Sequence, residues 1–307
     1  MSLQGVLRPG HVRLRVTDMD AALAHYRDLI GLIETGRDAA GRVYLKGWDE
    51  FDHHSVVLRE AESPGMDAMA FKVSDDACLD RFAKALDDFG VEVAHIDDGA
   101  QLALGRRVAF TAPTGHRFEL FAETEAVGNG LPEVNPDVWP DGLKGMHPTH
   151  FDHCLLYGDG VAATERLFTT VLGFDVAERV LATDGATIGS FLTCATKTHD
   201  VAFIHDSGKD RFHHAAFYLE SWGQIQTAAD LLRKNDVEID IGPTRHGISR
   251  GTTIYFFDPA GNRNEVFSGG YMYYPDRPTI TWTEDQLGKA IFYYEGRLNE
   301  RFLTRTT

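Results

Sequence analysis

Apolar residues in the first 123 positions recur at two spacings. Alternation of apolar and polar residues over 10–16 (GHVRLRV) predicts a strand, because successive side chains on a strand point to opposite faces. Leu23, Tyr26 and Ile30 then recur at helical spacing, and Gly31 follows as the expected end of that helix. The same patterns predict strands at 43–48, 55–58, 69–73, 108–111 and 118–121, and a second helix whose buried face holds Leu79, Phe82, Leu86 and Phe89.

The second half of the chain repeats the first. In each half, a histidine and a glycine 20 residues apart frame the first predicted helix. The segments AFKV (70–73) and AFYL (216–219) correspond, as do APTGHRFE (112–119) and DPAGNRNE (258–265). Internal repetition at this scale indicates one folding unit that has been duplicated. Within each half the order strand, helix, three strands occurs twice, which predicts an α+β fold of tandem βαβββ modules.

The segment 124–148 differs from the rest of the chain, because it is rich in Pro, Gly and Asn and lacks apolar periodicity. We interpret it as a linker between an N-terminal domain over 1–123 and a C-terminal domain over 149–270. The tail, 271–307, begins with aromatic residues and then predicts one helix packed on the C-terminal domain. That helix would begin with a capping box at Thr283 and Gln286 and bury Leu287, Ile291, Tyr294, Leu298 and Phe302.

Composition excludes several classes of partner. The net charge of −16 argues against nucleic acid and anionic membranes, because both are bound through basic surfaces. Cys78, Cys154 and Cys194 are too few and too scattered for a disulfide framework. Neither a signal-peptide pattern nor an apolar run of about 18 residues occurs, so we expect a cytoplasmic protein.

The densest chemical pattern lies in the segment 244–267, TRHGISRGTTIYFFDPAGNRNEVF. His246 precedes a β-branched and aromatic run that contains Tyr255. The turn DPAG (258–261) follows, and a second short strand carries Glu265. Asp-Pro-x-Gly favours a tight turn, since proline presets φ and glycine tolerates positive φ. The resulting hairpin places Tyr255 and Glu265 on neighbouring strands, with His246 on the loop leading in.

The internal repeat indicates which residues would share a metal with this carboxylate. In the C-terminal half the aligned positions are His153, His214 and Glu265. The corresponding N-terminal positions are His11, Ala68 and Glu119. In both halves 51 residues separate the last two members, but alanine cannot bind a metal, so we interpret the N-terminal half as non-catalytic. His213 and His214 should face opposite sides of their strand, so only His214 is expected in the site.

Two neutral imidazoles and one carboxylate form the facial ligand set that suits non-haem Fe(II) with open coordination positions. Mn(II) favours similar ligands and is the less favoured alternative. A structural zinc site would be closed by a fourth protein ligand. Three positions of an octahedral ion stay open to other ligands. The single carboxylate leaves a charge near +1, which a monoanionic ligand would neutralise.

The fixed positions of the segment 244–267 resemble the signature of the extradiol ring-cleavage dioxygenases, and the similarity to catechol 2,3-dioxygenases extends over essentially the whole chain. These enzymes belong to the vicinal-oxygen-chelate superfamily, in which βαβββ modules form a curled mixed sheet around a funnel. The resemblance implies an Fe(II)-dependent oxidoreductase in the degradation of aromatic compounds. It would cleave catechol with O2, beside the hydroxyl pair, to 2-hydroxymuconic semialdehyde. The resemblance also implies a homotetramer.

The resemblance assigns roles to three residues outside the ligand set. His199 matches the acid–base residue beside the O2 position. His246 and Tyr255 match residues that hydrogen-bond the hydroxyls of the substrate. The tail of the family covers the site, which would bring Ile291 or Phe302 to the pocket.

Three alternatives remain from the sequence. The preferred substrate of the dioxygenase could be a substituted or bicyclic catechol such as 2,3-dihydroxybiphenyl. A glyoxalase-like isomerase is disfavoured, because those enzymes typically divide four ligands between two modules. A non-catalytic small-molecule-binding member of the same fold would lack the metal set, so a stoichiometric bound metal would exclude it.

Overall fold

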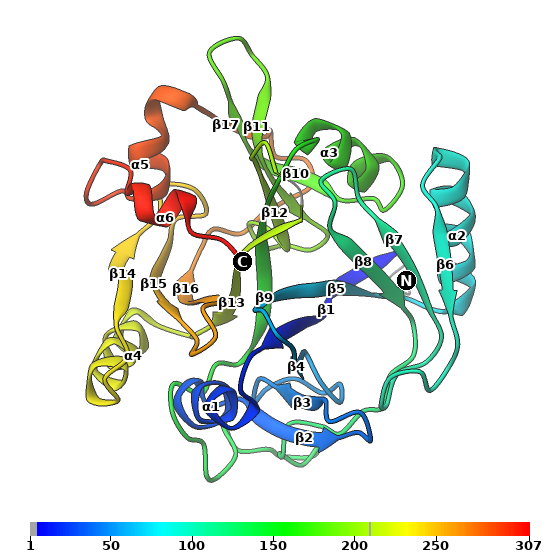
Figure 1. Cartoon of the computed structure of the whole chain (residues 1–307), viewed down its shortest axis with the longest axis vertical. Coiled ribbons are helices and arrows are strands. Elements are labelled where there is room, and N and C mark those ends of the chain that lie inside the picture. The colour runs from blue at the N-terminus through cyan, green and yellow to red at the C-terminus, as the bar shows by residue number, and fades with distance from the viewer. Residues whose placement is uncertain (1–4, 209) are drawn as a thin grey trace.

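The computed structural model describes residues 5–208 and 210–307, which form two large mixed β-sheets (Figure 1). The first sheet has eight strands in the order β2-β3-β4-β1-β5-β8-β7-β6. Its half of the chain contains β1 (Val6–Val16), α1 (Met19–Leu23), the π-helix η1 (Ala24–Ile30), β2 (Ile33–Arg37), β3 (Val43–Lys46), β4 (Val56–Glu60), β5 (Gly65–Val73), α2 (Asp76–Phe89), β6 (Val93–Ile96), β7 (Arg107–Thr111) and β8 (Arg117–Phe121).

The second sheet has nine strands in the order β14-β15-β16-β13-β9-β12-β11-β10-β17. Its half contains β9 (His150–Gly158), α3 (Val161–Thr170), β10 (Asp175–Leu181), β11 (Thr187–Thr193), β12 (Val201–His205), β13 (Arg211–Tyr218), α4 (Trp222–Lys234), β14 (Ile239–Arg245), β15 (Gly251–Phe257), β16 (Arg263–Gly269), β17 (Ile280–Thr283), the 3-10 helix η2 (Glu284–Gln286), α5 (Leu287–Ile291) and α6 (Glu300–Thr304).

Each sheet is built from two βαβββ modules joined through their first strands, and β17 adds a ninth strand to the second sheet. β1 pairs with β5, and β9 pairs with β13, antiparallel in both cases. In every module the last strand lies parallel to the first, as β16 does to β13. The predicted α+β fold of tandem βαβββ modules is confirmed. The first helix also ends as predicted, at Gly31, whose φ of +89° lies in the left-handed region that glycine adopts without strain.

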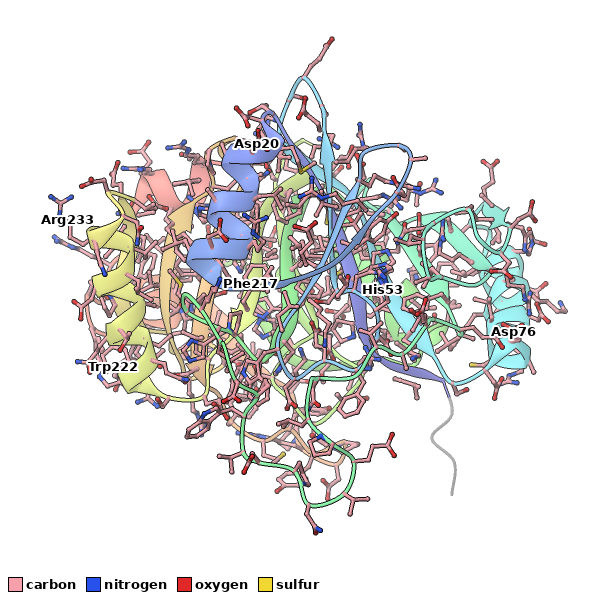
Figure 2. All side chains as sticks on the ribbon, turned by 90° about the horizontal axis from the view of Figure 1, so that it is seen from below. Asp20, His53, Asp76, Phe217, Trp222 and Arg233 are labelled. Atoms are coloured by element: carbon pink, nitrogen blue, oxygen red, sulfur yellow. The ribbon has the colours of Figure 1, made fainter. Side chains whose placement is uncertain are left out.

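Side chains from helices join the two halves. Phe168 on α3 packs edge-on against Phe118 of the first sheet and Phe203 of its own, with ring centroids 5.1 and 5.4 Å apart. From the other half, the hydroxyl of Tyr26 on η1 donates to Asp258 Oδ2 at 3.0 Å. Asp258 begins the turn before the strand of Glu265, so the N-terminal half supports the hairpin of the predicted site. Figure 2 shows α2 and α4 at opposite ends of the molecule, with α1 between them.

The single C-terminal helix predicted from the sequence is wrong, because the structure has four short elements there. β17 pairs in parallel with β10 at the edge of the sheet, and η2, α5 and α6 follow. The predicted capping box is also absent, since the side chain of Thr283 makes no capping hydrogen bond. Glycines explain the interruption. Gly296 has a φ of +62°, and its carbonyl oxygen lies 2.6 Å from the position that a Cβ at Gly288 would take, so the chain folds back on itself.

Three other expectations concern features of the whole chain. Cys78, Cys154 and Cys194 are free thiols, in line with the absence of a disulfide framework. Among the described helices, none has the length and apolar composition that crossing a membrane requires. No helix or strand is described between β8 and β9, where the linker was predicted, and the domain boundaries stay predictions.

Candidate metal centre and active site

Three strands of the second sheet bring two imidazoles and one carboxylate together. His153 lies on β9, His214 on β13 and Glu265 on β16, and all three side chains are buried. Glu265 Oε2 lies 3.2 Å from His153 Nε2 and 3.1 Å from His214 Nε2. The two Nε2 atoms are 3.4 Å apart. The register of the three strands brings these side chains together, because Ala216 on the central strand β13 stands opposite both His153 and Glu265.

The three separations fit a single metal ion. Ligand atoms about 2.1 Å from an octahedral ion are about 3.0 Å apart when they occupy neighbouring positions. The observed separations of 3.1 to 3.4 Å lie close to that value, so the atoms can form one face of an octahedron. Two imidazoles and one carboxylate are the donors of the facial set found in non-haem Fe(II) sites. The arrangement therefore fits a metal with open positions.

Two of these side chains are oriented by hydrogen bonds to a neighbour. His153 Nδ1 donates to Asp152 Oδ2 at 3.0 Å, which directs Nε2 of the same ring toward Glu265. The hydroxyl of Thr253 donates to Glu265 Oε1 at 2.5 Å and leaves Oε2 facing the histidines. Such outer contacts fix the tautomer and direction of a metal-binding side chain. Neither Asp152 nor Thr253 was predicted from the sequence as a residue that orients a ligand.

His213 contacts the proposed metal ligand His214, a role that was not predicted from the sequence. As alternation predicted, His214 lines the cavity and His213 does not. However, a β-bulge between Phe212 and His214 brings the Nδ1 atoms of the two histidines within 2.7 Å of each other. A neutral His214 that binds metal through Nε2 carries its proton on Nδ1, so His213 accepts that hydrogen bond. His213 Nε2 lies 2.8 Å from the carbonyl oxygen of Phe302 on α6 and 2.6 Å from Arg263 Nη1.

Charge at the cluster favours the ligand forms of these groups. Burial raises the pKa of Glu265, but hydrogen bonds from neighbouring histidines outweigh it and hold that pKa well below its usual range. Burial lowers the pKa of His214 to about 4, against the attraction of Glu265. Burial also lowers the pKa of His153, but hydrogen bonds to Asp152 and Glu265 more than offset it, so the pKa of His153 is raised. A metal therefore competes with a proton mainly at His153.

His246 and Tyr255 form a pair beside the cluster. His246 Nε2 lies 2.8 Å from the Tyr255 hydroxyl and 3.6 Å from Glu265 Oε1. Because His246 Nδ1 bonds to the carbonyl oxygen of Ile291 on α5, Nδ1 carries the proton and Nε2 accepts from the tyrosine. Burial and the charge of Glu265 raise the pKa of Tyr255 well above its usual value. The phenol therefore stays protonated and can donate.

His199 contacts the cluster through His153, whereas Tyr255 packs against His214. His199 belongs to the segment between β11 and β12, and its ring centroid is 4.2 Å from that of His153 and 5.3 Å from that of Phe191. Burial, with a smaller contribution from His153, holds the pKa of His199 well below its usual value. The ring is therefore neutral near neutral pH. All three residues predicted to be catalytic thus face the same cluster.

The cluster opens into a mostly apolar cavity of about 810 Å³, counting its open mouth. Its polar groups are concentrated at the metal cluster, His199, His246 and Tyr255. Apolar walls come from the second sheet and from the tail, including Leu155, Ile188, Phe191, Ile204, Ile248, Leu287, Ile291, Phe302 and Leu303. α5 and α6 therefore close the cavity, and both tail residues expected there line it.

Comparison with known proteins agrees with this geometry. Residues 66–125 match the family model of the catechol 2,3-dioxygenase-like N-terminal domain, and residues 150–266 match that of the glyoxalase/bleomycin resistance protein/dioxygenase superfamily. A metapyrocatechase, or catechol 2,3-dioxygenase, from a Pseudomonas species is 57% identical over 305 residues, covering 99% of both chains. The chain belongs to the extradiol ring-cleavage dioxygenases. The resemblance predicted from the sequence is confirmed.

Other extradiol dioxygenases share the whole fold. The solved structure of the 2,3-dioxygenase LapB from Pseudomonas sp. KL28 has a TM-score of 0.90 and 48% identity, covering 92% of this chain and 99% of that one. Homoprotocatechuate 2,3-dioxygenase from Brevibacterium fuscum has a TM-score of 0.87 at 27% identity, covering 99% and 93%. A manganese-dependent 2,3-dihydroxybiphenyl 1,2-dioxygenase from Geobacillus genomosp. 3 is 29% identical and covers 93% of this chain and 92% of its own. The family requires a metal, and this last relative depends on manganese.

The N-terminal half of this extradiol dioxygenase keeps the fold of the site without its ligands. His11 and Glu119 stand in the same register across β5 as their counterparts across β13, but Ala68 occupies the position of the second histidine. Glu119 is paired instead with Arg13 and Arg107, each at 2.9 Å. Arg117 lies 3.4 Å from the same carboxylate, so three guanidinium groups balance it in place of a metal.

Proposed function

We propose that this enzyme uses Fe(II), held by His153, His214 and Glu265, to cleave catechol with O2 to 2-hydroxymuconic semialdehyde. The observation that supports it most strongly is the cluster itself. Three buried donor atoms lie 3.1 to 3.4 Å apart and face an apolar cavity, and no fourth metal-binding side chain joins them within residues 5–208 and 210–307. When bound, the metal supplies the Lewis acidity and redox activity that the reaction with O2 requires.

In this proposal His246 and Tyr255 orient the ring by its hydroxyl pair. His246 Nε2 is an acceptor placed 3.6 Å from Glu265 Oε1, so it can take a proton from one hydroxyl as substrate enters. The protonated Tyr255 can donate to the resulting anionic oxygen, where a charge-assisted hydrogen bond is strongest. Together they favour one orientation and one ionisation state of the catechol.

His199 holds the proton-transfer role beside His153. Its ring is neutral, because burial lowers its pKa, and its closest aromatic neighbour is His153. A neutral imidazole can accept a proton from a reacting group and return it later in the cycle. The apolar wall around it, including Phe191 and Ile188, excludes water that would otherwise exchange those protons.

Fe(II) is proposed over Mn(II), although both accept this donor set. The metal can be decided by removing it with a chelator and restoring either ion without air. Fe(II) should restore more activity per bound ion than Mn(II). Greater restoration by Mn(II) would contradict the choice of iron and leave the ligand assignment intact.

The reaction itself can be tested with protein loaded with Fe(II) in the absence of O2. Catechol should bind without reacting, and admitting air should consume one O2 per catechol and produce the yellow ring-opened semialdehyde. A colourless cis,cis-muconate product would contradict the mechanism. If none of catechol, methylcatechols and 2,3-dihydroxybiphenyl led to O2 uptake, a sequestering function would be favoured.

We also propose that the enzyme assembles as a homotetramer. Exposed apolar side chains on the segment that connects β8 to β9 support association. Val134 and Val138 are 75% exposed, and Trp139 is 64% exposed. Light scattering coupled to size-exclusion chromatography measures the mass directly, and a monomer would contradict the proposal. The cytoplasmic location stays a prediction.

A further inference from the structure

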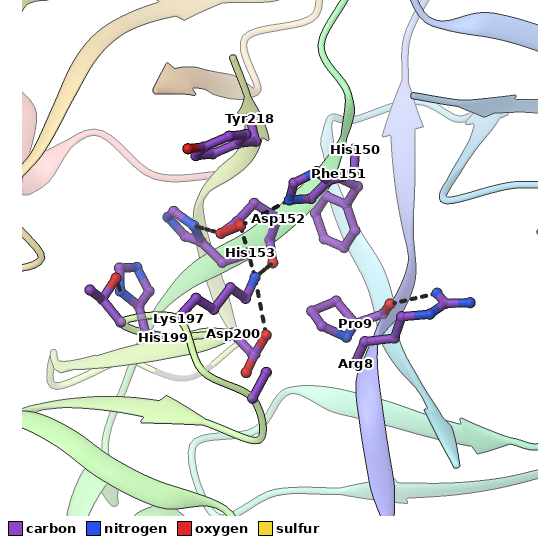
Figure 3. A network of polar contacts seen from close by, with 12 residues as sticks. Arg8, Pro9, His150, Phe151, Asp152, His153, Lys197, His199, Asp200 and Tyr218 are labelled. Carbon is purple, nitrogen blue, oxygen red and sulfur yellow. Dashed lines mark hydrogen bonds and ion pairs between the residues drawn. The ribbon is translucent and has the colours of Figure 1, made fainter. Parts of the chain in front are cut away.

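A buried ion-pair network adjoins the metal cluster and has no role in the mechanism above (Figure 3). Lys197 extends from the segment between β11 and β12 toward β9. Its Nζ donates to the carbonyl oxygen of Asp152 at 2.6 Å and lies 2.9 Å from Asp152 Oδ1 and 3.0 Å from Asp200 Oδ1. The side chains of the two carboxylates are only 5% and 0% exposed. One cation therefore joins two segments that are distant in the sequence.

Asp152 connects this cation to the metal cluster. Its other oxygen, Oδ2, accepts the hydrogen bond from His153 Nδ1 at 3.0 Å. An outer carboxylate that accepts this hydrogen bond fixes the direction of the imidazole and strengthens it as a ligand.

Asp200 connects the same cation to His199, its neighbour along the chain. Asp200 Oδ2 accepts from the hydroxyl of Thr193 at 3.1 Å and from the backbone N–H of Cys194 at 2.7 Å. These bonds close the loop on which His199 lies. Because the rings of His199 and His153 have centroids 4.2 Å apart, movement of this loop relative to β9 would change their spacing directly.

No alternative cation among the described lysines and arginines lies within 4.0 Å of either carboxylate. Arg8 and Asp52 line a second cavity together with Lys197 and Asp200, and both Arg8 and Lys72 are already paired with Asp52. A neutral side chain at position 197 would leave two buried carboxylates without their counterion. A buried carboxylate without its counterion moves toward water, and that movement weakens the contact that orients His153.

We propose that Lys197 is a positioning residue that holds His153 and His199 in one fixed arrangement for ring cleavage. The inference rests on the proposed function, because it takes His153 as a metal ligand and His199 as the acid–base residue. Lys197 does not line the substrate cavity, so it acts through Asp152 and Asp200. Its compact ammonium group reaches three oxygens in different directions, a geometry that a planar guanidinium does not reproduce.

The test is the full-length Lys197→Met variant, compared with wild type in metal affinity and in catalysis. Competition with a chromophoric chelator should show metal affinity reduced about 10- to 100-fold, as for other outer contacts of metal ligands. With metal at saturation, kcat for catechol should fall about tenfold or more, because His199 is displaced, while KM changes less than about threefold.

Lys72→Met is the matched control. Lys72 Nζ makes a similar ion pair, 2.9 Å from Asp52 Oδ1, and the two lysine side chains have similar exposures of 21% and 29%. Lys72→Met should keep wild-type metal affinity and kcat. Equal losses in both variants would indicate general destabilisation and overturn the inference, as would wild-type metal affinity and kcat in Lys197→Met.

Asp200→Asn keeps the inference testable if Lys197→Met does not fold. It releases the loop of His199 but leaves the bond between Lys197 and Asp152. We expect kcat to fall while metal affinity stays within about twofold of wild type. Unchanged kcat in Asp200→Asn would overturn the role of Lys197 in placing His199. A wild type that binds no metal would overturn the proposed function as well, whereas an active wild type beside unaffected variants would overturn only this inference.

Discussion

Removing the hydroxyl of Tyr255 isolates one proposed contact with the substrate. The ring packs against His214 and Phe302, with centroids 5.2 and 4.8 Å apart. Phenylalanine would keep both contacts and the shape of the cavity. The hydroxyl itself bonds to His246 Nε2 at 2.8 Å. The variant Tyr255→Phe therefore changes a hydrogen-bond donor with little change in packing.

The expected fall in kcat/KM of Tyr255→Phe follows from the negative charge of the catechol oxygen to which the hydroxyl is proposed to donate. A hydrogen bond to a charged group contributes about 1.5–3 kcal/mol, and about 1.4 kcal/mol corresponds to a tenfold change in rate. If Tyr255 donates to an anionic catechol oxygen in the transition state, kcat/KM should fall about 10- to 150-fold. Loss of the bond to His246 should lower the free energy of unfolding by about 1 kcal/mol. Metal content should not change, because Tyr255 is outside the ligand set.

O2 uptake at several catechol concentrations gives kcat/KM, elemental analysis gives metal content and urea unfolding gives stability. Tyr44→Phe is the control. Tyr44 is fully buried in the N-terminal half, and its hydroxyl bonds to Asp38 Oδ2 at 2.7 Å. That control should lose about 1.5–3 kcal/mol of stability, because its partner is a carboxylate, but keep kcat/KM. A wild-type kcat/KM in Tyr255→Phe would refute the substrate contact, and loss of metal would refute the placement of Tyr255 outside the ligand set.

Three other predictions concern the ligands, the acid–base residue and two buried histidines. Alanine at either ligand histidine, or Glu265→Gln, should remove metal and activity, whereas Glu119→Gln should keep both; metal analysis of the purified variants decides. His199→Gln should retain metal and bind catechol but turn over about 10²–10⁴-fold more slowly, and an unchanged kcat would contradict its role. Burial lowers the pKa of His25 to about 3 and of His116 to about 4, below about 6.5 in the unfolded chain. In that interval the unfolded chain binds more protons, so each histidine should lower the free energy of unfolding by about 1.4 kcal/mol per unit of pH decrease. Urea unfolding at pH 7 and pH 5 measures this, and equal stability would contradict it.

Much of the fold was predictable because its signals are local and occur four times. The spacing of apolar residues distinguishes strands from helices, and each βαβββ module buries its own helix and strands against one another. The proposed metal ligands could be identified for a related reason. Duplicated strands keep their register, so the 51-residue interval between His214 and Glu265 matches that between Ala68 and Glu119.

Irregular backbone and distant contacts were not predictable in this way. The contact between His213 and His214 depends on a β-bulge, which strict alternation does not allow for. The tail has helical spacing from Leu287 to Phe302, but the glycines at 288 and 296 meet only after the chain turns back. Neither a bulge nor such a close approach leaves a periodic signal in the sequence.

The sequence by itself determined the order of the modules and the residue types of the metal set, because both are encoded by spacing along one chain. Only the tertiary structure decided that the three donor atoms lie 3.1 to 3.4 Å apart and that Lys197 reaches the carbonyl of Asp152 across 45 residues. The physical reason is that hydrogen bonds and ion pairs depend on ångström-scale distances and on direction. Periodicity reports which face a side chain takes, whereas packing of the strands sets how far it lies from its partner.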